Sequence, residues 1–81
     1  MIKDVVVVIE EDLMWPGMYA MEIKFTAERH GRRDAGFIQS LVFSEQPRPE
    51  TYLDAVRTEF EYQFPDEDWA VFEDLLRKAM P

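Results

Sequence analysis

A chain of 81 residues has room for one hydrophobic core, and a hydrophobic content of 47% is sufficient to build it. The chain contains no cysteine, which excludes disulfide bonds, cysteine-ligated zinc and a thiol nucleophile. Its net charge of −8 repels nucleic acid and anionic membranes, and it favours partners with basic surfaces.

The first predicted strand covers residues 4–10, where five β-branched side chains follow one another from Val5 to Ile9. Because this run does not alternate with polar residues, it favours a strand that is covered on both faces or central in its sheet. Pro16 and Gly17 then predict a type II turn, since proline fixes φ and glycine accepts a positive φ.

Residues 18–29 show the clearest alternation in the chain, which predicts a half-buried antiparallel strand. The apolar face of this strand consists of Tyr19, Met21, Ile23, Phe25 and Ala27. The polar residues 30–34 predict a connection, and residues 35–44 predict the returning strand. Strict alternation in that strand places on one face Phe37, Gln39, Leu41 and Phe43, and on the other Ile38, Ser40 and Val42.

Two amphipathic helices are predicted in the last part of the chain, at residues 49–64 and 66–80. Pro49 suits the first turn of the first helix, and its apolar stripe is formed by Tyr52, Leu53, Val56, Phe60 and Phe64. Pro65 ends that helix, and Asp66 is the predicted N-cap of the second. The apolar stripe of the second helix is formed by Trp69, Phe72, Leu75, Leu76, Ala79 and Met80.

These elements predict a single α+β domain over residues 1–81, a small two-layer fold. A three-stranded antiparallel sheet (β-β-β) is followed by two C-terminal helices packed on one of its faces. The covered face is expected to be that of Tyr19, Met21, Ile23 and Phe25. No apolar run is long enough to cross a bilayer, and no signal-peptide pattern stands at the start of the chain. A cytoplasmic location is therefore expected.

No arrangement of residues in the sequence predicts catalysis. His30 is the only histidine, and neither Ser40 nor Ser44 lies in a nucleophile-elbow motif. The three glycines form no phosphate-binding loop, and the acids from Asp66 to Asp68 lack the spacing of a calcium loop. The protein is therefore expected to have no enzymatic activity, no cofactor and no metal site.

Two charged surfaces and one aromatic residue are candidate contacts for a partner. The only basic cluster, in a predicted loop, could grip a carboxylate or phosphate, or it could be a solvated turn; it contains Arg29, His30, Arg32 and Arg33. Trp15 would anchor an interface if its indole is exposed, and otherwise it closes the end of the core. An acidic surface on the helices is the alternative, and it contains Glu59, Glu67, Asp68, Glu73 and Asp74.

Three functions are compatible with these features. The first is a protein-interaction module, a regulator or inhibitor that binds another protein and does not bind nucleic acid directly. The second is an acidic mimic of nucleic acid that occupies a basic groove. In length, acidity and lack of cysteine the chain resembles phage-encoded inhibitors such as anti-restriction and anti-CRISPR proteins. The third is a small structural subunit or a homodimer.

Overall fold

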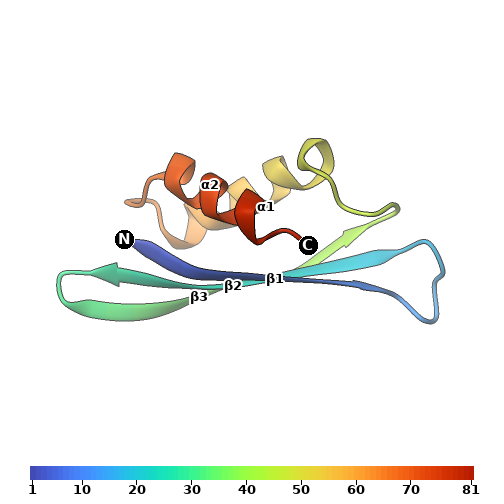
Figure 1. Cartoon of the computed structure of the whole chain (residues 1–81), viewed down its shortest axis with the longest axis horizontal. Helices are drawn as coiled ribbons and strands as arrows, with labels where there is room; N and C mark the ends of the chain where they lie inside the picture. Colours follow the sequence, from blue (N-terminus) through green and yellow to red (C-terminus); the bar gives the residue numbers. More distant parts are fainter.

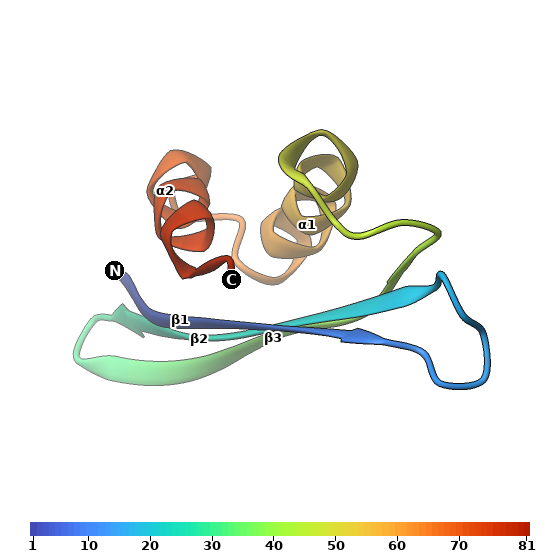
Figure 2. The ribbon, with the colours of Figure 1, turned by 45° about the vertical axis from the view of Figure 1, so that its right-hand side comes forward.

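The computed structural model describes all residues from 1 to 81 and has two layers, a sheet and a pair of helices. The strands β1 (Ile2–Glu11), β2 (Tyr19–Arg29) and β3 (Arg32–Phe43) form an antiparallel sheet in the order β1-β2-β3. The helices α1 (Pro49–Gln63) and α2 (Trp69–Ala79) lie on one face of this sheet (Figures 1 and 2). The predicted α+β fold is confirmed.

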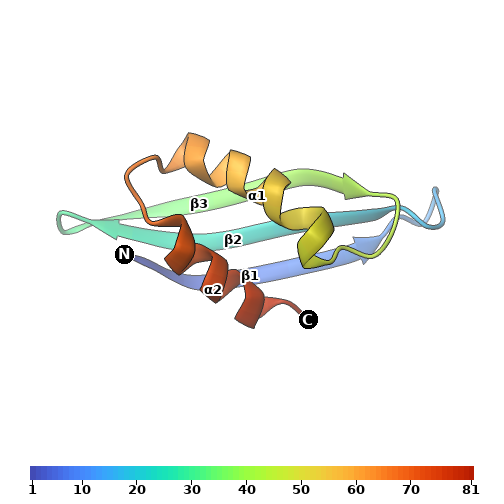
Figure 3. The same ribbon diagram turned by 90° about the horizontal axis from the view of Figure 1, so that it is seen from above.

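The two helices divide the covered face between them. Figure 3 shows α2 along the β1 side of the sheet and α1 along the β3 side, and the contacts between elements follow this division. At the start of α1, Pro49 occupies the first turn, and the Thr51 hydroxyl accepts the N–H of Arg48 at 2.8 Å. Neither helix is both long enough and apolar enough to cross a membrane.

β1 is an edge strand, so the expectation that it is central or covered on both faces is wrong. It pairs only with β2, and its side chains alternate in burial. Val5, Val7 and Ile9 pack against the core, whereas Val6 and Val8 are exposed on the face that no helix covers. β-branched residues favour extended backbone on either face, so a run of valines does not reveal how many of its faces are buried.

The β2–β3 connection is shorter than predicted, because β3 begins at Arg32 rather than at residue 35. Arg29 pairs with Arg32 across the hairpin, which leaves only His30 and Gly31 in the turn. Both turn residues have positive φ, 51° and 76°, as a two-residue hairpin of the primed type requires. The length of the polar segment therefore overstated the length of the loop.

A β-bulge interrupts the pairing of β2 with β3. Ile23 pairs with Ile38 and Met21 pairs with Leu41, so one residue on β2 faces two on β3 between these pairs. Within this segment Ser40 has a positive φ of 63°, which is uncommon for a residue other than glycine.

The bulge changes which side chains of β3 share a face. Ile38 is in the core, and Leu41 and Phe43 pack against it, whereas Phe37 and Val42 are exposed on the uncovered face. Strict alternation had grouped Phe37 with Leu41 and Ile38 with Val42, and both groupings are wrong. One extra residue shifts the face of every side chain that follows it.

The N-cap of α2 is Asp68, and the prediction of Asp66 is wrong. The Asp68 carboxylate accepts the backbone N–H of Ala70 at 2.9 Å, and α2 begins at Trp69. A turn precedes the helix, in which the N–H of Glu67 donates to the Phe64 carbonyl at 3.1 Å. Three consecutive acids can each cap a helix, so the sequence alone does not select among them.

The core is dominated by aromatic rings from the middle strand and from both helices. Phe25 of β2 lies within 6.0 Å, between ring centroids, of Phe60, Phe64 and Phe72. The rings of Phe60 and Phe72 stack at 4.3 Å and an interplanar angle of 14°, which joins α1 to α2. Such ring pairs add to the stabilisation that burial of their area provides.

Phe72→Ala and Phe60→Ala are each expected to lower the free energy of unfolding by about 3–5 kcal/mol, the range for truncation of a buried phenylalanine. Both rings are completely buried and stack on one another. Tyr62→Ala is the matched control, because Tyr62 is 86% exposed and its loss should cost less than about 0.5 kcal/mol. Urea or thermal unfolding measures all three, and equal stabilities would contradict the aromatic core.

Asp68→Ala is expected to cost about 0.5–2 kcal/mol, because it removes the N-cap of α2, while Asp68→Asn should retain most of the stability. Asp66→Ala removes only an exposed ion pair with Arg29, at 3.7 Å, and should cost less than about 1 kcal/mol. Thermal melting ranks the three variants. A larger loss for Asp66→Ala than for Asp68→Ala would place the helix start where the sequence predicted it.

Candidate functional site

The β1–β2 loop, residues 12–18, extends past both helices at one end of the sheet (Figures 1 and 3). Three consecutive large apolar side chains lie in this loop: Leu13 is 97% exposed, Met14 83% and Trp15 68%. We call these three residues the apolar tip. Isolated apolar side chains on a surface are ordinary, but a contiguous group on a projecting loop is typical of an interaction site.

Hydrogen bonds hold the first half of this loop in place. The Asp12 carboxylate accepts the backbone N–H groups of Met14 at 2.8 Å and of Trp15 at 3.2 Å. The backbone N–H of Asp12 in turn donates to the Met18 carbonyl at 2.8 Å, which closes the loop at its base. An aspartate side chain that binds the backbone two residues later is a common way to order a turn.

The second half of the loop is the type II turn that Pro16 and Gly17 predicted. The N–H of Met18 donates to the Trp15 carbonyl at 3.0 Å, and Gly17 has the positive φ of 88° that this turn requires. The N–H of Gly17 also donates to the Glu11 carboxylate at 3.2 Å. Five of the six backbone N–H groups of the loop, all but that of Leu13, thus donate within the protein, while its apolar side chains remain in solvent.

Trp15 therefore meets the condition set for an interface anchor, and it does not close the end of the core. Leu13 and Met14 were not predicted as site residues. They could have been found, because they lie between the acids of residues 10–12 and a Pro-Gly turn, where no sheet face is available to bury them. Apolar side chains in a predicted turn have no core to enter.

The basic cluster lies at the opposite end of the sheet, and two of its arginines are engaged within the protein. Arg29 lies over the Phe64 ring at 5.5 Å and approaches the carboxylates of Asp66 at 3.7 Å and Glu67 at 3.8 Å. Arg33 binds the carboxylate of Glu28 at 3.1 Å. Arg29 joins the hairpin to the turn between α1 and α2, and Arg33 joins the two strands of the hairpin. Because their charges are already paired, these two arginines are less available to a ligand.

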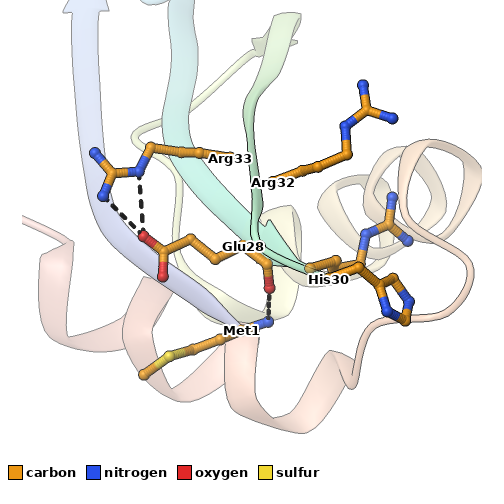
Figure 4. Close-up of a pocket in the computed structure, with 7 residues that line it drawn as sticks. Met1, Glu28, His30, Arg32 and Arg33 are labelled. Carbon is orange, nitrogen blue, oxygen red and sulfur yellow. Dashed lines mark hydrogen bonds and ion pairs between the residues drawn. The ribbon is translucent and has the colours of Figure 1, made fainter.

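Arg32 and His30 are exposed and have no ion-pair partner in the structure. Figure 4 shows Arg33 turned toward Glu28, while Arg32 extends from the other side of the hairpin. Together with Met1 these residues border an open hollow of about 410 Å³. No buried polar side chain points into this hollow.

Glu28 has the most perturbed carboxylate of this end. A hydrogen bond from Lys3, at 2.7 Å, is the main cause that lowers the pKa of Glu28 below its ordinary value of 4.5. Desolvation acts in the opposite direction, and the positive charges of Lys3 and Arg33 add to the lowering. The ionised form of Glu28 is therefore favoured in the folded protein.

Most of the predicted acidic surface also has partners within the chain. Asp68 caps α2, and Glu67 approaches Arg29 and the Met1 nitrogen, with only 12% of its side chain exposed. The remaining contacts join neighbouring turns of α2: Glu73 accepts the indole N–H of Trp69 and binds Arg77, and Asp74 binds Lys78 at 2.9 Å. Glu59 alone has no hydrogen-bond or ion-pair partner from its side chain. These acids are arranged as helix caps and i,i+4 pairs.

No group of three or more histidine, aspartate or glutamate side chains is placed to hold a metal ion. Comparisons of the chain with known protein families, with curated proteins and with solved structures found no match.

Glu28→Gln is expected to remove part of the pH dependence of stability. Because the pKa of Glu28 is lower in the folded state, its contribution is complete above the unfolded pKa of about 4.5 and is lost as the pH falls through the folded value. The difference in melting temperature between wild type and Glu28→Gln should thus be constant near neutral pH and shrink below about pH 4.5. Glu59→Gln is the control without an ion pair, and an unchanged difference at pH 3 for Glu28→Gln would contradict the assignment.

Proposed function

We propose that this protein is a non-enzymatic interaction module that binds another protein through the apolar tip. The observation that carries this proposal is the loop in which Leu13, Met14 and Trp15 are exposed although their backbone is held by hydrogen bonds. By occupying a surface of its partner, such a module acts as a regulator or inhibitor. The expected cytoplasmic location belongs to the same proposal.

The order of the loop supports a role in binding. A loop that is already in one conformation loses little entropy when it binds, so more of its contact energy appears as affinity. Tryptophan is among the residues that most often dominate the binding energy of an interface. In the proposed complex Trp15 enters an apolar pocket of the partner, and Leu13 and Met14 pack at the margin of that pocket.

Charge around the tip indicates the chemistry of the partner. Glu10 is exposed and has no ion-pair partner, and Glu11 and Asp12 lie between it and the tip. An apolar anchor with acidic neighbours fits a pocket that has basic residues on its rim. The same acids oppose insertion of the tip into an anionic membrane surface.

An acidic mimic of nucleic acid has less support from the geometry. Four of its five candidate residues, all but Glu59, are engaged in caps, ion pairs or hydrogen bonds. Salt separates the two functions, because binding through exposed charges weakens steeply as salt is added and an apolar anchor is nearly insensitive to it.

The test uses three immobilised baits in an extract of the cells that produce the protein: wild type, Leu13→Ser with Trp15→Ser, and Tyr62→Ser. A partner is expected on the wild-type and Tyr62→Ser baits, because Tyr62 is also a large exposed side chain but lies on α1. The partner should be absent from the bait that carries both Leu13→Ser and Trp15→Ser, which we call the tip variant. With the purified partner, Trp15→Ala should weaken the affinity by about 30-fold or more, corresponding to a loss of at least about 2 kcal/mol.

Circular dichroism of the tip variant must match that of wild type. Calorimetry should show that the affinity falls only slightly between low and high salt, because salt screens the charges at the rim and not the apolar anchor. A partner that binds the tip variant as well as wild type contradicts the proposal. A partner lost instead when Glu67, Asp68, Glu73 and Asp74 are neutralised would support the mimic.

A further inference from the structure

Both helices lie on one face of the sheet, so no helix covers the other face (Figure 2). This uncovered face carries apolar side chains on both outer strands. Val6 and Val8 of β1 and Phe37 and Val42 of β3 are between 42% and 59% exposed on this outer face. They flank the middle strand on either side, so they form two apolar borders rather than scattered single residues. A surface of this kind is typical of a contact with another protein.

Two opposite charges lie between these borders on the middle strand. Lys24 stands in one row with Val6 and Phe37, and Glu22 stands in the next row beside Val8. Neither charge has a partner within the chain. Lys24 and Arg32 are the only lysine or arginine side chains that form no ion pair.

We infer that the outer face binds a second copy of this chain, sheet against sheet, as a two-fold symmetric dimer. If the symmetry axis crosses the strands at Ile23, Lys24 of each copy lies against Glu22 of the other copy. The contact then contains two intermolecular ion pairs. Lys24 and Glu22, which have no partner in the monomer, thereby gain one in the dimer. Sheets that pack in this way lie about 10 Å apart, with their strands within about 30° of alignment.

The order of the two charges selects this orientation. The alternative symmetric packing has its axis along the strands, so the strands of the two copies run in the same direction. In that arrangement Lys24 lies against Lys24 and Glu22 against Glu22, and like charges at an interface are strongly unfavourable. The antiparallel arrangement is thus the one in which the face is complementary to itself, as a two-fold interface requires.

The shape of the face is compatible with the same two-fold rotation. The rotation places Val6 of one copy against Val8 of the other, so the β1 borders meet. The rotation also places Phe37 of one copy over the bulge of the other, where a shallow hollow of about 140 Å³ lies beside Gln39 and Ser40. An exposed ring thereby meets a depression, and an exposed valine meets an exposed valine.

The expected dimer is weak and reversible. Three strands about 4.8 Å apart, with ten to twelve residues each, offer about 500 Å² from each copy and about 1,000 Å² in total. Stable interfaces bury about 1,200–2,000 Å². The antiparallel arrangement would place the two apolar tips at opposite ends of the dimer, so that it could hold two partners at once; this consequence alone rests on the proposed function.

Charge reversal tests the dimer directly. Sedimentation velocity of the full chain over a concentration series should show a monomer–dimer equilibrium, and Glu22→Lys or Lys24→Glu alone should each weaken it at least about tenfold. An equimolar mixture of these two variants should restore the dimer, because every Lys then faces a Glu. The double variant Glu22→Lys/Lys24→Glu should also dimerise as wild type does.

The controls change the net charge equally at other places. Glu59→Lys matches Glu22→Lys, and Arg32→Glu matches Lys24→Glu; neither residue forms an ion pair, and both controls should dimerise as wild type does. The tip variant should dimerise normally, which separates this inference from the proposed function. A wild type that stays monomeric up to about 1 mM, single variants that dimerise unchanged, or a mixture that fails to restore the dimer each overturn it.

Discussion

The contact between the Phe25 ring and the backbone of Gly36 is the constraint on which the rest of this structure depends. Gly36 pairs with Phe25 across the sheet, and a Cβ at that position would collide with the ring. Because β3 has no side chain there, the ring can lie across it and present itself to both helices. Phe60 of α1 and Phe72 of α2 both pack against this ring. The glycine at position 36 of β3 therefore determines where the two helices lie on the sheet.

The projecting hairpins follow from the difference in length between the two layers. A strand of 12 residues spans about 40 Å, whereas a helix of 15 residues spans about 22 Å, so the helices cannot cover the sheet from end to end. The molecule is accordingly elongated, with extents of 44 × 21 × 21 Å. A hairpin must project at each end, and one sheet face stays open because both helices use the other.

Local patterns predicted most of the fold, and they failed where the outcome depends on distant parts of the chain. Alternation predicted the buried face of β2, and Pro16-Gly17 predicted the turn that presents Trp15. The bulge at Ser40 leaves no mark in the alternation, and the choice of Asp68 over Asp66 depends on how the turn after Phe64 is made. Of the apolar tip, only Trp15 was predicted, because leucine and methionine are ordinary core residues and only their place beside a turn marks them as exposed.

Acidic side chains have different uses at the two ends of the sheet, and this difference supports the proposal that the β1–β2 end binds a partner. Near the β2–β3 hairpin, Asp66 and Glu67 form ion pairs with Arg29, so these acids are paired within the chain. In the β1–β2 loop, Glu11 and Asp12 bind backbone N–H groups instead, and no basic side chain is present. Their hydrogen bonds hold a loop whose apolar side chains contribute nothing to the core. Ordering a backbone costs conformational entropy, and this loop is ordered although its apolar side chains are not buried. That combination supports the proposal that the loop binds a surface outside the protein, because an ordered loop loses little further entropy on binding.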